Sequence, residues 1–336
     1  MKVLIIGGTG LLGLEAAQQL LAKKQQVIGL ALPPLPVGVS LPSGYQVIFK
    51  NYLNMGDDEL LALMEGVQAL VFAAGIDERV EGQHPIYDLY DKYNIQPVIR
   101  LLGLAKKAGV HSSVVLGSYF TYAHRLHPNW QLDKYHPYIA ARIKQMEAAL
   151  AYAEDGTMHV AVLELPYIFG VQPGRQPVWT ILLEQILAMK RRTYYPKGGT
   201  AMVTVRQVGQ AIVGAINKNH GGNAIPIGYY NMTWKQMLTL FHRYTGINRN
   251  IVTIPTWMYR LGVMLIVKKK KRQGIEMGLN MVKFSNVMTS NLFIDKNEGS
   301  KMLGVKPDDI QTAIANSIHL SMDAIKGKKL EKMKSE

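Results

Sequence analysis

The glycine-rich turn near the amino terminus constrains the fold more than any other part of the sequence. Val3 to Ile6 are β-favouring apolar residues, and Gly7, Gly10 and Gly13 follow them at the spacing GxxGxxG. The apolar period of residues Leu14 to Ala22 then predicts a helix. A buried strand that turns sharply into a helix through three glycines is typical of a dinucleotide-binding α/β domain.

Each glycine of this turn has a predicted role. Gly7 lets the chain turn where a side chain would clash, Gly10 lets the backbone approach a ligand, and Gly13 lets the helix lie against the strand. Free N–H groups at the helix start form an anion site suited to a pyrophosphate. The turn therefore predicts these cofactor-binding residues: Gly7, Thr9, Gly10, Leu11, Leu12 and Gly13. A glycine-rich turn without a ligand is the alternative.

Composition narrows the class of protein. The chain has 336 residues, is 48% hydrophobic and holds no cysteine, so it can bury a full core without disulfides or thiolate metal sites. Its opening apolar run is broken by glycines, which favours a first strand over an export signal. No apolar run approaches the roughly 18 residues of a membrane span. We therefore predict a globular cytoplasmic protein whose net charge of +14 favours anionic partners.

The second predicted strand leaves the choice of cofactor open. Gln26 to Leu30 is followed by Ala31-Leu32-Pro33-Pro34, which supplies neither an acid for the NAD ribose nor an arginine for the NADP phosphate. A third strand, Val47 to Phe49, precedes Asn51, whose side chain can reach an adenine. The sequence therefore predicts NAD or NADP without choosing between them.

Further strands alternate with helices along the first half of the chain. Strands are predicted at 68–72, 114–116 and 159–163. The small residues Ala73, Ala74 and Gly75 follow the first of them and allow a flat ligand to approach, although tight packing explains them as well. A helical stretch from Tyr87 to Ala108 precedes the second, and another helix spans Ile139 to Ala153. This alternation predicts a doubly wound parallel sheet.

The carboxyl-terminal half is less regular. Here we predict helices at 178–189, 207–216 and 234–244, and strands at 201–205 and 224–228; Thr233 is the N-cap of the last helix and Gly246 its end. We expect a Rossmann-type domain of residues 1–168 with about 206–229. Residues 169–205 and 230–325 are then a smaller C-terminal substrate-binding lid, and 326–336 a solvated basic tail.

In this order, several short segments resemble the extended short-chain dehydrogenase/reductase family, which contains NAD(P)-dependent sugar-nucleotide epimerases, dehydratases and reductases. The resemblance covers nearly the whole chain. Its motifs are the glycine turn, Ala73-Ala-Gly75, Asn94 ahead of Ala108-Gly-Val110, Gly117-Ser118 with Tyr122, Pro137-Tyr-Ile-Ala-Ala-Arg142, Leu165-Pro-Tyr-Ile-Phe-Gly170 and Leu303-Gly-Val-Lys-Pro307.

The resemblance implies a set of catalytic residues. It makes Tyr138 the acid/base of a hydride transfer, Ser118 the group that polarises the substrate oxygen, and Asn94 the residue that holds the arrangement. The family's lysine, four residues after the tyrosine, is Arg142 here. Arginine keeps the charge that favours phenolate but cannot release a proton. The resemblance also implies that Pro166 and Ile168 contact the cofactor.

Three functions remain open from the sequence. The first is an oxidoreductase or epimerase/dehydratase acting on a sugar-nucleotide or another small carbonyl or hydroxyl substrate, as a homodimer through the helices that carry Asn94 and Tyr138. The second is a catalytically degenerate NAD(P)-binding sensor or scaffold. The third is a peripheral membrane reductase with a lipid-like substrate. Cations for a phosphorylated substrate are available in the lid, unless they are ordinary surface charge: Arg175, Arg191, Arg192 and Arg206.

The segment Trp257 to Arg272 is the strongest indication of a partner. Its apolar residues end in the run Lys268-Lys-Lys-Lys-Arg272, which suits an acidic membrane surface. A lid helix packed on the core, with a solvated basic loop after it, is the alternative. We find no nucleic-acid-binding motif, and so predict no nucleic-acid partner. We also predict no metal site, because no matching carboxylate accompanies the histidines of the 124–136 loop: His124, His127 and His136.

Overall fold

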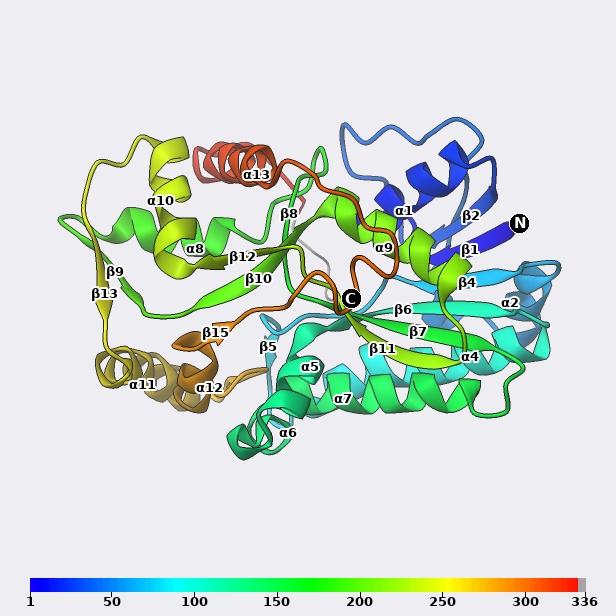
Figure 1. Ribbon diagram of the computed structural model, residues 1–336, viewed down its shortest axis with the longest axis horizontal. Helices are drawn as coiled ribbons and strands as arrows, with labels where there is room; N and C mark the ends of the chain where they lie inside the picture. Colours follow the sequence, from blue (N-terminus) through cyan, green and yellow to red (C-terminus); the bar gives the residue numbers. More distant parts are fainter. Residues whose placement is uncertain (332–336) are drawn as a thin grey trace.

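A computed structural model of the chain describes residues 1–331, and its largest feature is a seven-stranded parallel sheet (Figure 1). The strand order is β11-β7-β6-β4-β1-β2-β3, so the direction of winding reverses between β1 and β4. The strands are β1 (Lys2–Ile6), β2 (Gln26–Ala31), β3 (Gln46–Phe49), β4 (Ala69–Phe72), β6 (Ser112–Ser118), β7 (His159–Leu165) and β11 (Gly222–Pro226). The predicted doubly wound Rossmann-type fold is confirmed.

Helices cover both faces of this sheet, which explains why its strands are apolar throughout. Val3 and Ile5 of β1 pack in one buried cluster with α1 (Leu11–Ala22) and α9 (Val205–Lys218). The residues between them, Leu4 and Ile6, pack in the opposite cluster. That cluster lies under α2 (Asp57–Met64), α4 (Gln96–Lys107) and α7 (Pro137–Leu150), on the lower side of the sheet in Figure 1.

The chain returns to the main sheet late, as predicted. A capping box starts α9: the Thr204 hydroxyl accepts from the Gln207 backbone, and the Gln207 side chain accepts from the Thr204 backbone. The helix packs on α1, and β11 then pairs in parallel with β7. The carboxyl-terminal half therefore closes one edge of the sheet.

A second set of elements lies to one side of the main sheet (Figure 1). A small sheet is formed by β12 (Tyr230–Thr233), β10 (Gly199–Thr204) and β15 (Asn291–Leu292), with β8 (Tyr167–Phe169) also paired to β10. Two further strands, β9 (Thr193–Pro196) and β13 (Ile251–Ile254), pair with each other. The helices here are α8 (Thr180–Ala188), α10 (Trp234–Thr245), α11 (Thr256–Arg272), α12 (Met281–Met288) and α13 (Ile310–Ile325). The domain boundaries stay a prediction.

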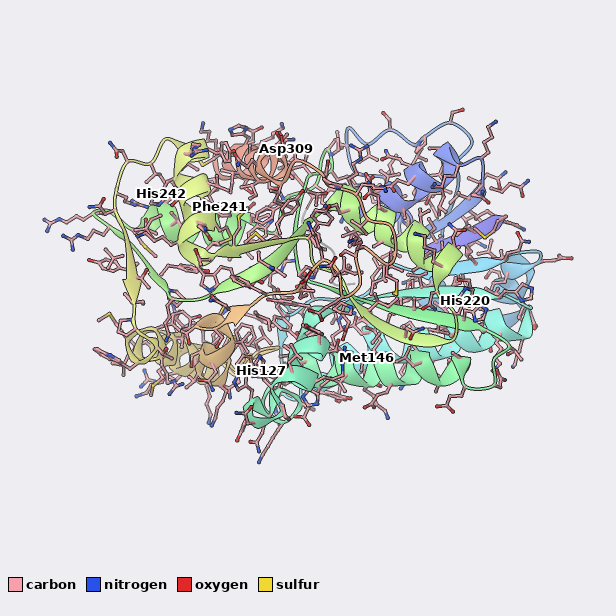
Figure 2. The ribbon with its side chains drawn as sticks, viewed as in Figure 1. His127, Met146, His220, Phe241, His242 and Asp309 are labelled. Atoms are coloured by element: carbon pink, nitrogen blue, oxygen red, sulfur yellow. The ribbon has the colours of Figure 1, made fainter. Side chains whose placement is uncertain are left out.

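Helix α10 (Trp234–Thr245) has the predicted cap residue at each end. Thr233 forms a capping box with Gln236, and Gly246 ends the helix with φ of 71°. Phe241 is buried against the rest of the lid, and Figure 2 shows it next to His242 on this helix. The helix is thus a well-capped surface element with its apolar side inward.

Several local predictions differ from the structure in their bounds or in the kind of helix. The first helix begins at Leu11, three residues before the predicted start at Leu14. The helix predicted from Tyr87 to Ala108 consists of α3 (Tyr87–Tyr90), a π-helical turn (Asp91–Ile95) and α4. The basic run Lys268 to Arg272 is not a loop, because α11 continues through it.

Two further predictions concern segments that proved to be ordered. His124 lies on α5 (Tyr119–Leu126), not in a loop, and His136 is a buried N-cap of α7. Part of the predicted tail is attached to the lid, because the backbone of Glu331 forms a parallel β-bridge with Arg175. Residues 332–336 lie outside the described part of the chain. Within residues 1–331, no helix combines the length and apolarity needed to cross a membrane.

Candidate functional site

One cavity of about 660 Å³ lies outside the carboxyl ends of the central strands and extends to the lid. Open α/β sheets bind ligands at this place, where the strand order reverses. Fourteen of the sixteen predicted site residues line the cavity: Gly7, Thr9, Gly10, Leu11, Leu12, Asn51, Ala73, Ala74, Gly75, Ser118, Tyr138, Arg142, Pro166 and Ile168. Gly13 and Asn94 are the two that stand behind its wall.

The glycine turn shows why two of its three glycines have no room for a side chain. Gly7 has φ of 81°, and a Cβ there would lie 2.6 Å from the Ala73 carbonyl oxygen. A Cβ on Gly13 would lie 2.3 Å from the Gly7 carbonyl oxygen, so α1 could not pack on the turn. Gly10 is different, since its Cβ would meet only the Gly7 oxygen at 3.2 Å while the residue lines the cavity.

The amino terminus of α1 fits an anionic ligand. Leu11 and Leu12 open the helix and line the cavity, and the first N–H groups of a helix have no partner within it. Because Gly10 adds no side chain there, a pyrophosphate can approach the backbone closely. The turn therefore fits the diphosphate of a dinucleotide.

The adjoining end of β2 is apolar. Leu30, Ala31, Leu32 and Pro34 line this part of the cavity, and none of them carries a charge. Asn51 lines it too, but its Oδ1 accepts a hydrogen bond from the Leu53 backbone at 3.0 Å and so caps a short turn. Neither cofactor is selected by a charged side chain at this strand end.

Tyr138 and Arg142 meet inside the cavity. They lie one turn apart on α7, and Arg142 Nε donates to the Tyr138 hydroxyl at 3.2 Å. The other guanidinium nitrogens donate to the Leu116 carbonyl at 3.3 Å, the Gln145 Oε1 at 2.7 Å and the Ile76 carbonyl at 3.4 Å. The arginine is thereby fixed with its charge beside the phenol.

The ionisation of Tyr138 reflects two opposed effects. Burial raises the pKa of the Tyr138 phenol above its ordinary value, and the Arg142 guanidinium and a hydrogen bond with Ser118 offset this only in part. Ser118 is also the N-cap of α5, and it lines the cavity beside the phenol. The serine, the tyrosine and the arginine are thus brought together as predicted.

Asn94 acts from behind the wall. In the π-helical turn, its Oδ1 accepts from the Ile76 backbone at 2.8 Å and its Nδ2 donates to the Ile76 carbonyl at 2.9 Å. Gly75 has φ of 119°, and a Cβ there would lie 2.4 Å from the Asn94 Oδ1. Since the same carbonyl accepts from Arg142, Asn94 holds the segment that helps to orient the arginine.

The first turn of α7 is joined to the lid. The Tyr138 backbone N–H donates to the Gly278 carbonyl at 3.0 Å. Two residues earlier, His136 Nδ1 accepts from the Asn280 backbone at 3.1 Å. Burial of the His136 imidazole lowers its pKa to about 4, so the ring is neutral at pH 7. A lid segment therefore completes the start of the helix that carries Tyr138.

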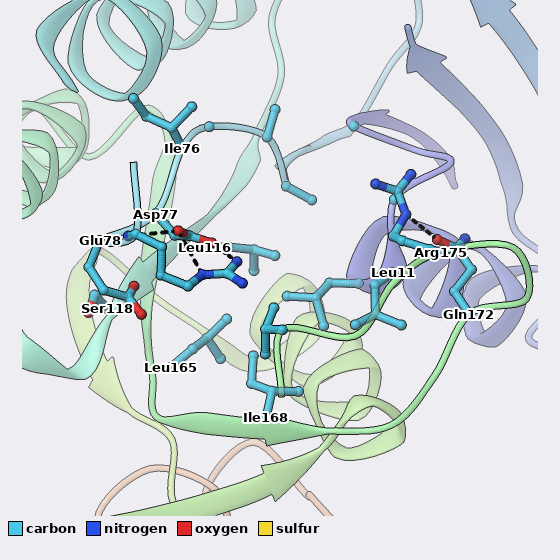
Figure 3. A pocket seen from close by; sticks show the side chains of 18 of the residues that line it. Leu11, Ile76, Asp77, Glu78, Leu116, Ser118, Leu165, Ile168, Gln172 and Arg175 are labelled. Carbon is cyan, nitrogen blue, oxygen red and sulfur yellow. Dashed lines mark hydrogen bonds and ion pairs between the residues drawn. The ribbon is translucent and has the colours of Figure 1, made fainter. Parts of the chain in front are cut away.

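Three consecutive charged residues of the site were missed by sequence reasoning. Asp77, Glu78 and Arg79 line the cavity, and Arg79 Nε donates to Asp77 Oδ1 at 3.0 Å. Burial, and then the Asp77 carboxylate, raise the pKa of Glu78. Figure 3 shows Asp77 and Glu78 at the Ser118 end of the cavity, away from Leu11. Their position just after Ala73-Ala74-Gly75, at a strand end, was the signal that could have found them.

The wall contributed by the lid is mostly apolar. It includes Pro177, Val178, Trp179, Ile181, Leu182 and Tyr195. Of the four predicted lid cations, Arg175 alone lines the cavity, at the Leu11 end, where its Nε donates to Gln172 Oε1 at 2.9 Å (Figure 3). Arg206 lies elsewhere, 3.7 Å from an oxygen of Asp308. Residues 1–331 contain no group of three or more histidines or carboxylates placed to hold a metal ion.

With this geometry in view, comparison with protein families is decisive. The family model described as the NAD dependent epimerase/dehydratase family matches residues 3–228. The chain belongs to the NAD-dependent epimerase/dehydratase family. It is therefore an NAD-dependent enzyme by family, which confirms the resemblance found in the sequence motifs. No curated protein in the comparison matches this family member.

Solved structures share the fold over the whole chain. The crystal structure of gox2253 has a TM-score of 0.75 at 16% identity, over 98% of this chain and 99% of that one. A UDP-glucuronic acid 4-epimerase from Bacillus cereus, in complex with NAD, has a TM-score of 0.67 at 14% identity, over 96% and 99%. MoeE5, in complex with UDP-glucuronic acid and NAD, has a TM-score of 0.64 at 16% identity, over 96% and 100%.

Proposed function

We propose that this family member is a cytoplasmic NAD(P)-dependent oxidoreductase or epimerase/dehydratase in which Tyr138 transfers the proton that accompanies hydride transfer. The observation that carries the proposal is the contact of 3.2 Å between Arg142 and the Tyr138 hydroxyl, inside the cavity that the glycine turn also lines. A phenol beside a fixed cation is poised to give and take a proton, because the cation stabilises phenolate.

The chain's own residues divide the work. The nicotinamide cofactor, when bound, accepts or supplies the hydride. Tyr138 removes a proton from a substrate hydroxyl or returns it to a carbonyl oxygen, and Ser118 donates a hydrogen bond to that oxygen. Arg142 keeps its own proton throughout, so it acts on Tyr138 through its charge and the hydrogen bond from Nε, and the proton is exchanged between the phenol and the substrate oxygen.

Three groups of residues are proposed to hold the cofactor. The glycine turn would hold the diphosphate, because it leads into the amino terminus of α1, which no side chain caps. Asn51 and the β2 end would border the adenosine, and Ala73 to Gly75 would lie against flat parts of the ligand. On the lid side, Pro166 and Ile168 would contact the nicotinamide half.

Two substrate classes follow from different observations. A sugar-nucleotide is the first, since MoeE5 and a Bacillus cereus epimerase of the same fold are described in complex with UDP-glucuronic acid. The second is an apolar, lipid-like carbonyl compound, which the apolar lid wall favours. Among the described residues, the cavity's cations are Arg79, Arg142 and Arg175, and each of them donates a hydrogen bond to another side chain of the protein.

Cofactor binding is the first test. Calorimetry with NAD, NADH, NADP and NADPH should give tight binding of at least one, weakened at least about tenfold in Gly10→Ala, because the added methyl group would face the diphosphate. Gly56→Ala is the matched control: this N-cap glycine has no atom within 4 Å of its Cβ position. Absence of binding to all four would leave a Rossmann scaffold and sink the oxidoreductase proposal.

A substrate screen is the second test. Protein saturated with the preferred cofactor is mixed with UDP-glucose, UDP-glucuronic acid or a long-chain ketone, and nicotinamide absorbance and product epimers are followed. Turnover of any of them, lost in Tyr138→Phe, supports the proposed chemistry and chooses the substrate class. Tight cofactor binding without turnover would favour the sensor or scaffold alternative. Sedimentation of the same samples tests the proposed homodimer through α4 and α7.

A further inference from the structure

Helix α11 turns most of its large apolar side chains away from the protein. Surface helices normally bury their apolar face, as α10 does through Met237, Leu238 and Phe241. In α11 only Val263 is fully buried. Six large apolar side chains are exposed instead: Trp257, Met258, Leu261, Met264, Leu265 and Ile266. Val263 and the partly buried Tyr259 are therefore the main apolar contribution to the attachment of the helix to the lid.

Polar side chains supply much of that attachment. Arg260 Nε donates to Ser285 Oγ at 3.0 Å, and its Nη2 donates to Asn286 Oδ1 at 3.0 Å, both on α12. Further along the same side of the helix, Lys270 forms an ion pair with Glu81 of β5 (Glu81–Gly82). Because Arg260, Val263 and Lys270 lie on one side of the helix, the opposite side faces away from the lid.

The outward side forms a patch that is continuous along the helix. Trp257, Leu261 and Leu265 follow one another at intervals of four residues and are 61%, 55% and 73% exposed. Lys268 and Arg272 continue the same line. A contiguous exposed apolar patch of this kind marks an interaction site, whereas single apolar residues scattered over a surface are ordinary.

The charge of the helix restricts what can cover the patch. Residues 256–272 contain no Asp or Glu, and of the five consecutive cations Lys268 to Arg272 only Lys270 has an ion pair among residues 1–331. The chain as a whole carries +14. A partner must therefore accept apolar side chains and offer negative charge next to them.

We infer that α11 is the docking surface for an anionic lipid bilayer. The apolar residues Trp257 to Ile266 enter the boundary between headgroups and acyl chains, where an indole is favoured. Lys268, Lys269, Lys271 and Arg272 lie against the acidic headgroups. The helix lies on the membrane and does not cross it, in keeping with its length of 17 residues.

A second copy of the chain fits this surface poorly. A symmetric contact brings the same patch from both molecules together, with five cations on each side and no acid on either helix. Such like-charge juxtaposition is costly in an interface. The bilayer meets both requirements at once, because its interior is apolar and its acidic headgroups are negative.

Binding to vesicles of defined composition tests the inference. The full chain is floated with vesicles of phosphatidylcholine alone or with 30% phosphatidylserine, at low and high salt. Binding is expected to the acidic vesicles and to weaken with salt. Trp257 is the most exposed of the four tryptophans, so its fluorescence should shift to shorter wavelength on binding, and Trp257→Phe should remove that shift.

Matched variants separate apolar insertion from charge. Neutralising Lys268, Lys269, Lys271 and Arg272 to Gln should weaken binding at least about 100-fold, at roughly fivefold per cation. The control changes four other exposed lysines with no ion pair among residues 1–331: Lys23, Lys24, Lys107 and Lys190. Leu261→Ser with Leu265→Ser should abolish the fluorescence shift while leaving cofactor binding intact, since neither residue lines the cavity.

Three results would overturn the inference. They are equal binding to neutral and acidic vesicles, no binding to either, and equal weakening in the control variant. A loss of self-association in Leu261→Ser with Leu265→Ser, without vesicle binding by the wild type, would identify a second copy as the occupant. None of these outcomes depends on the proposed chemistry, which is read from cofactor binding and turnover.

Discussion

The two ends of the cavity differ in whether backbone or side chains form them. At the glycine-turn end, backbone forms the site: Gly7 and Gly13 lie so close to other backbone atoms that a methyl group has no place. At the other end, side chains form the site: Tyr138 and Arg142 are placed by a network that runs through α7 and the Ile76 carbonyl, and Glu78 lines the cavity as well. Backbone geometry tolerates few substitutions, whereas a side-chain network can be retuned one residue at a time.

The difference coincides with the one position where the sequence departs from the catalytic motif that the family resemblance implies. The cation next to Tyr138 is an arginine in place of the lysine that the resemblance implies, and four hydrogen bonds to side chains and carbonyls hold it. The glycine turn, by contrast, keeps all three glycines. Chemistry at the side-chain end can therefore change while the cofactor end stays the same.

Tyr138→Phe should have the largest effect. Removing the hydroxyl deletes the group that moves the proton, so turnover of the substrate found by screening should fall by roughly 10²- to 10⁴-fold. Cofactor affinity should change little, because the glycine turn is untouched. Tyr152→Phe is the control, since its hydroxyl donates to the Ile99 carbonyl at 2.8 Å outside the cavity. Full turnover in Tyr138→Phe would remove the side-chain end from the chemistry.

Gly13→Ala tests the backbone end. Glycine to alanine in a helix interior usually stabilises by about 1 kcal/mol. Here the added Cβ would lie 2.3 Å from the Gly7 oxygen, so the free energy of unfolding should fall by roughly 1–3 kcal/mol and cofactor affinity with it. Gly262→Ala on α11, with no atom within 4 Å, should be stabilising. Urea unfolding of both variants makes the comparison, and a stable Gly13→Ala protein would contradict it.

Arg142→Lys should cost about tenfold in turnover and roughly 1–2 kcal/mol in the free energy of unfolding. An ammonium cannot reach the Leu116 and Ile76 carbonyls and the Gln145 side chain in the same planar arrangement. Turnover and thermal unfolding are measured on the same preparation. Higher turnover in the lysine variant would mean that the arginine is a loss of function and not a tuned replacement.

Glu78→Gln should have the smallest effect, visible in the pH dependence of stability. Because the pKa of Glu78 is raised by folding, its contribution is complete below the unfolded value of about 4.3 and is lost as pH rises through the folded value. The variant should therefore gain stability relative to wild type as the pH is raised from about 4 to about 8. Parallel curves from urea unfolding across that range would show that Glu78 is ionised without cost.

Sequence reasoning predicted the features that depend on a local pattern of residues. The spacing of Gly7, Gly10 and Gly13 between apolar strand and helix predicted the turn, and alternating strands and helices predicted the sheet. Tyr138, Arg142 and Ser118 came from a family resemblance and do meet in the cavity. Cofactor and catalytic roles for these residues stay predictions.

Other features depend on contacts that no local pattern records. The π-helical turn at Asp91–Ile95 leaves the apolar period nearly unchanged, so it is invisible until Asn94 is seen bonded to Ile76. Asp77 to Arg79 have ordinary loop composition. In α11 the apolar residues are nearly continuous, which gives no sign of the side that faces outward.

The bonds between the start of α7 and the lid also set an order of assembly. His136 and its partner Asn280 are 144 residues apart in the chain, so a ribosome adding roughly 5–20 residues per second supplies the partner about 7 to 30 s later. The glycine turn can form long before that. A nascent chain should thus be able to hold a nucleotide while its acid/base tyrosine still lacks its final alignment, and activity would appear only when synthesis has passed residue 280.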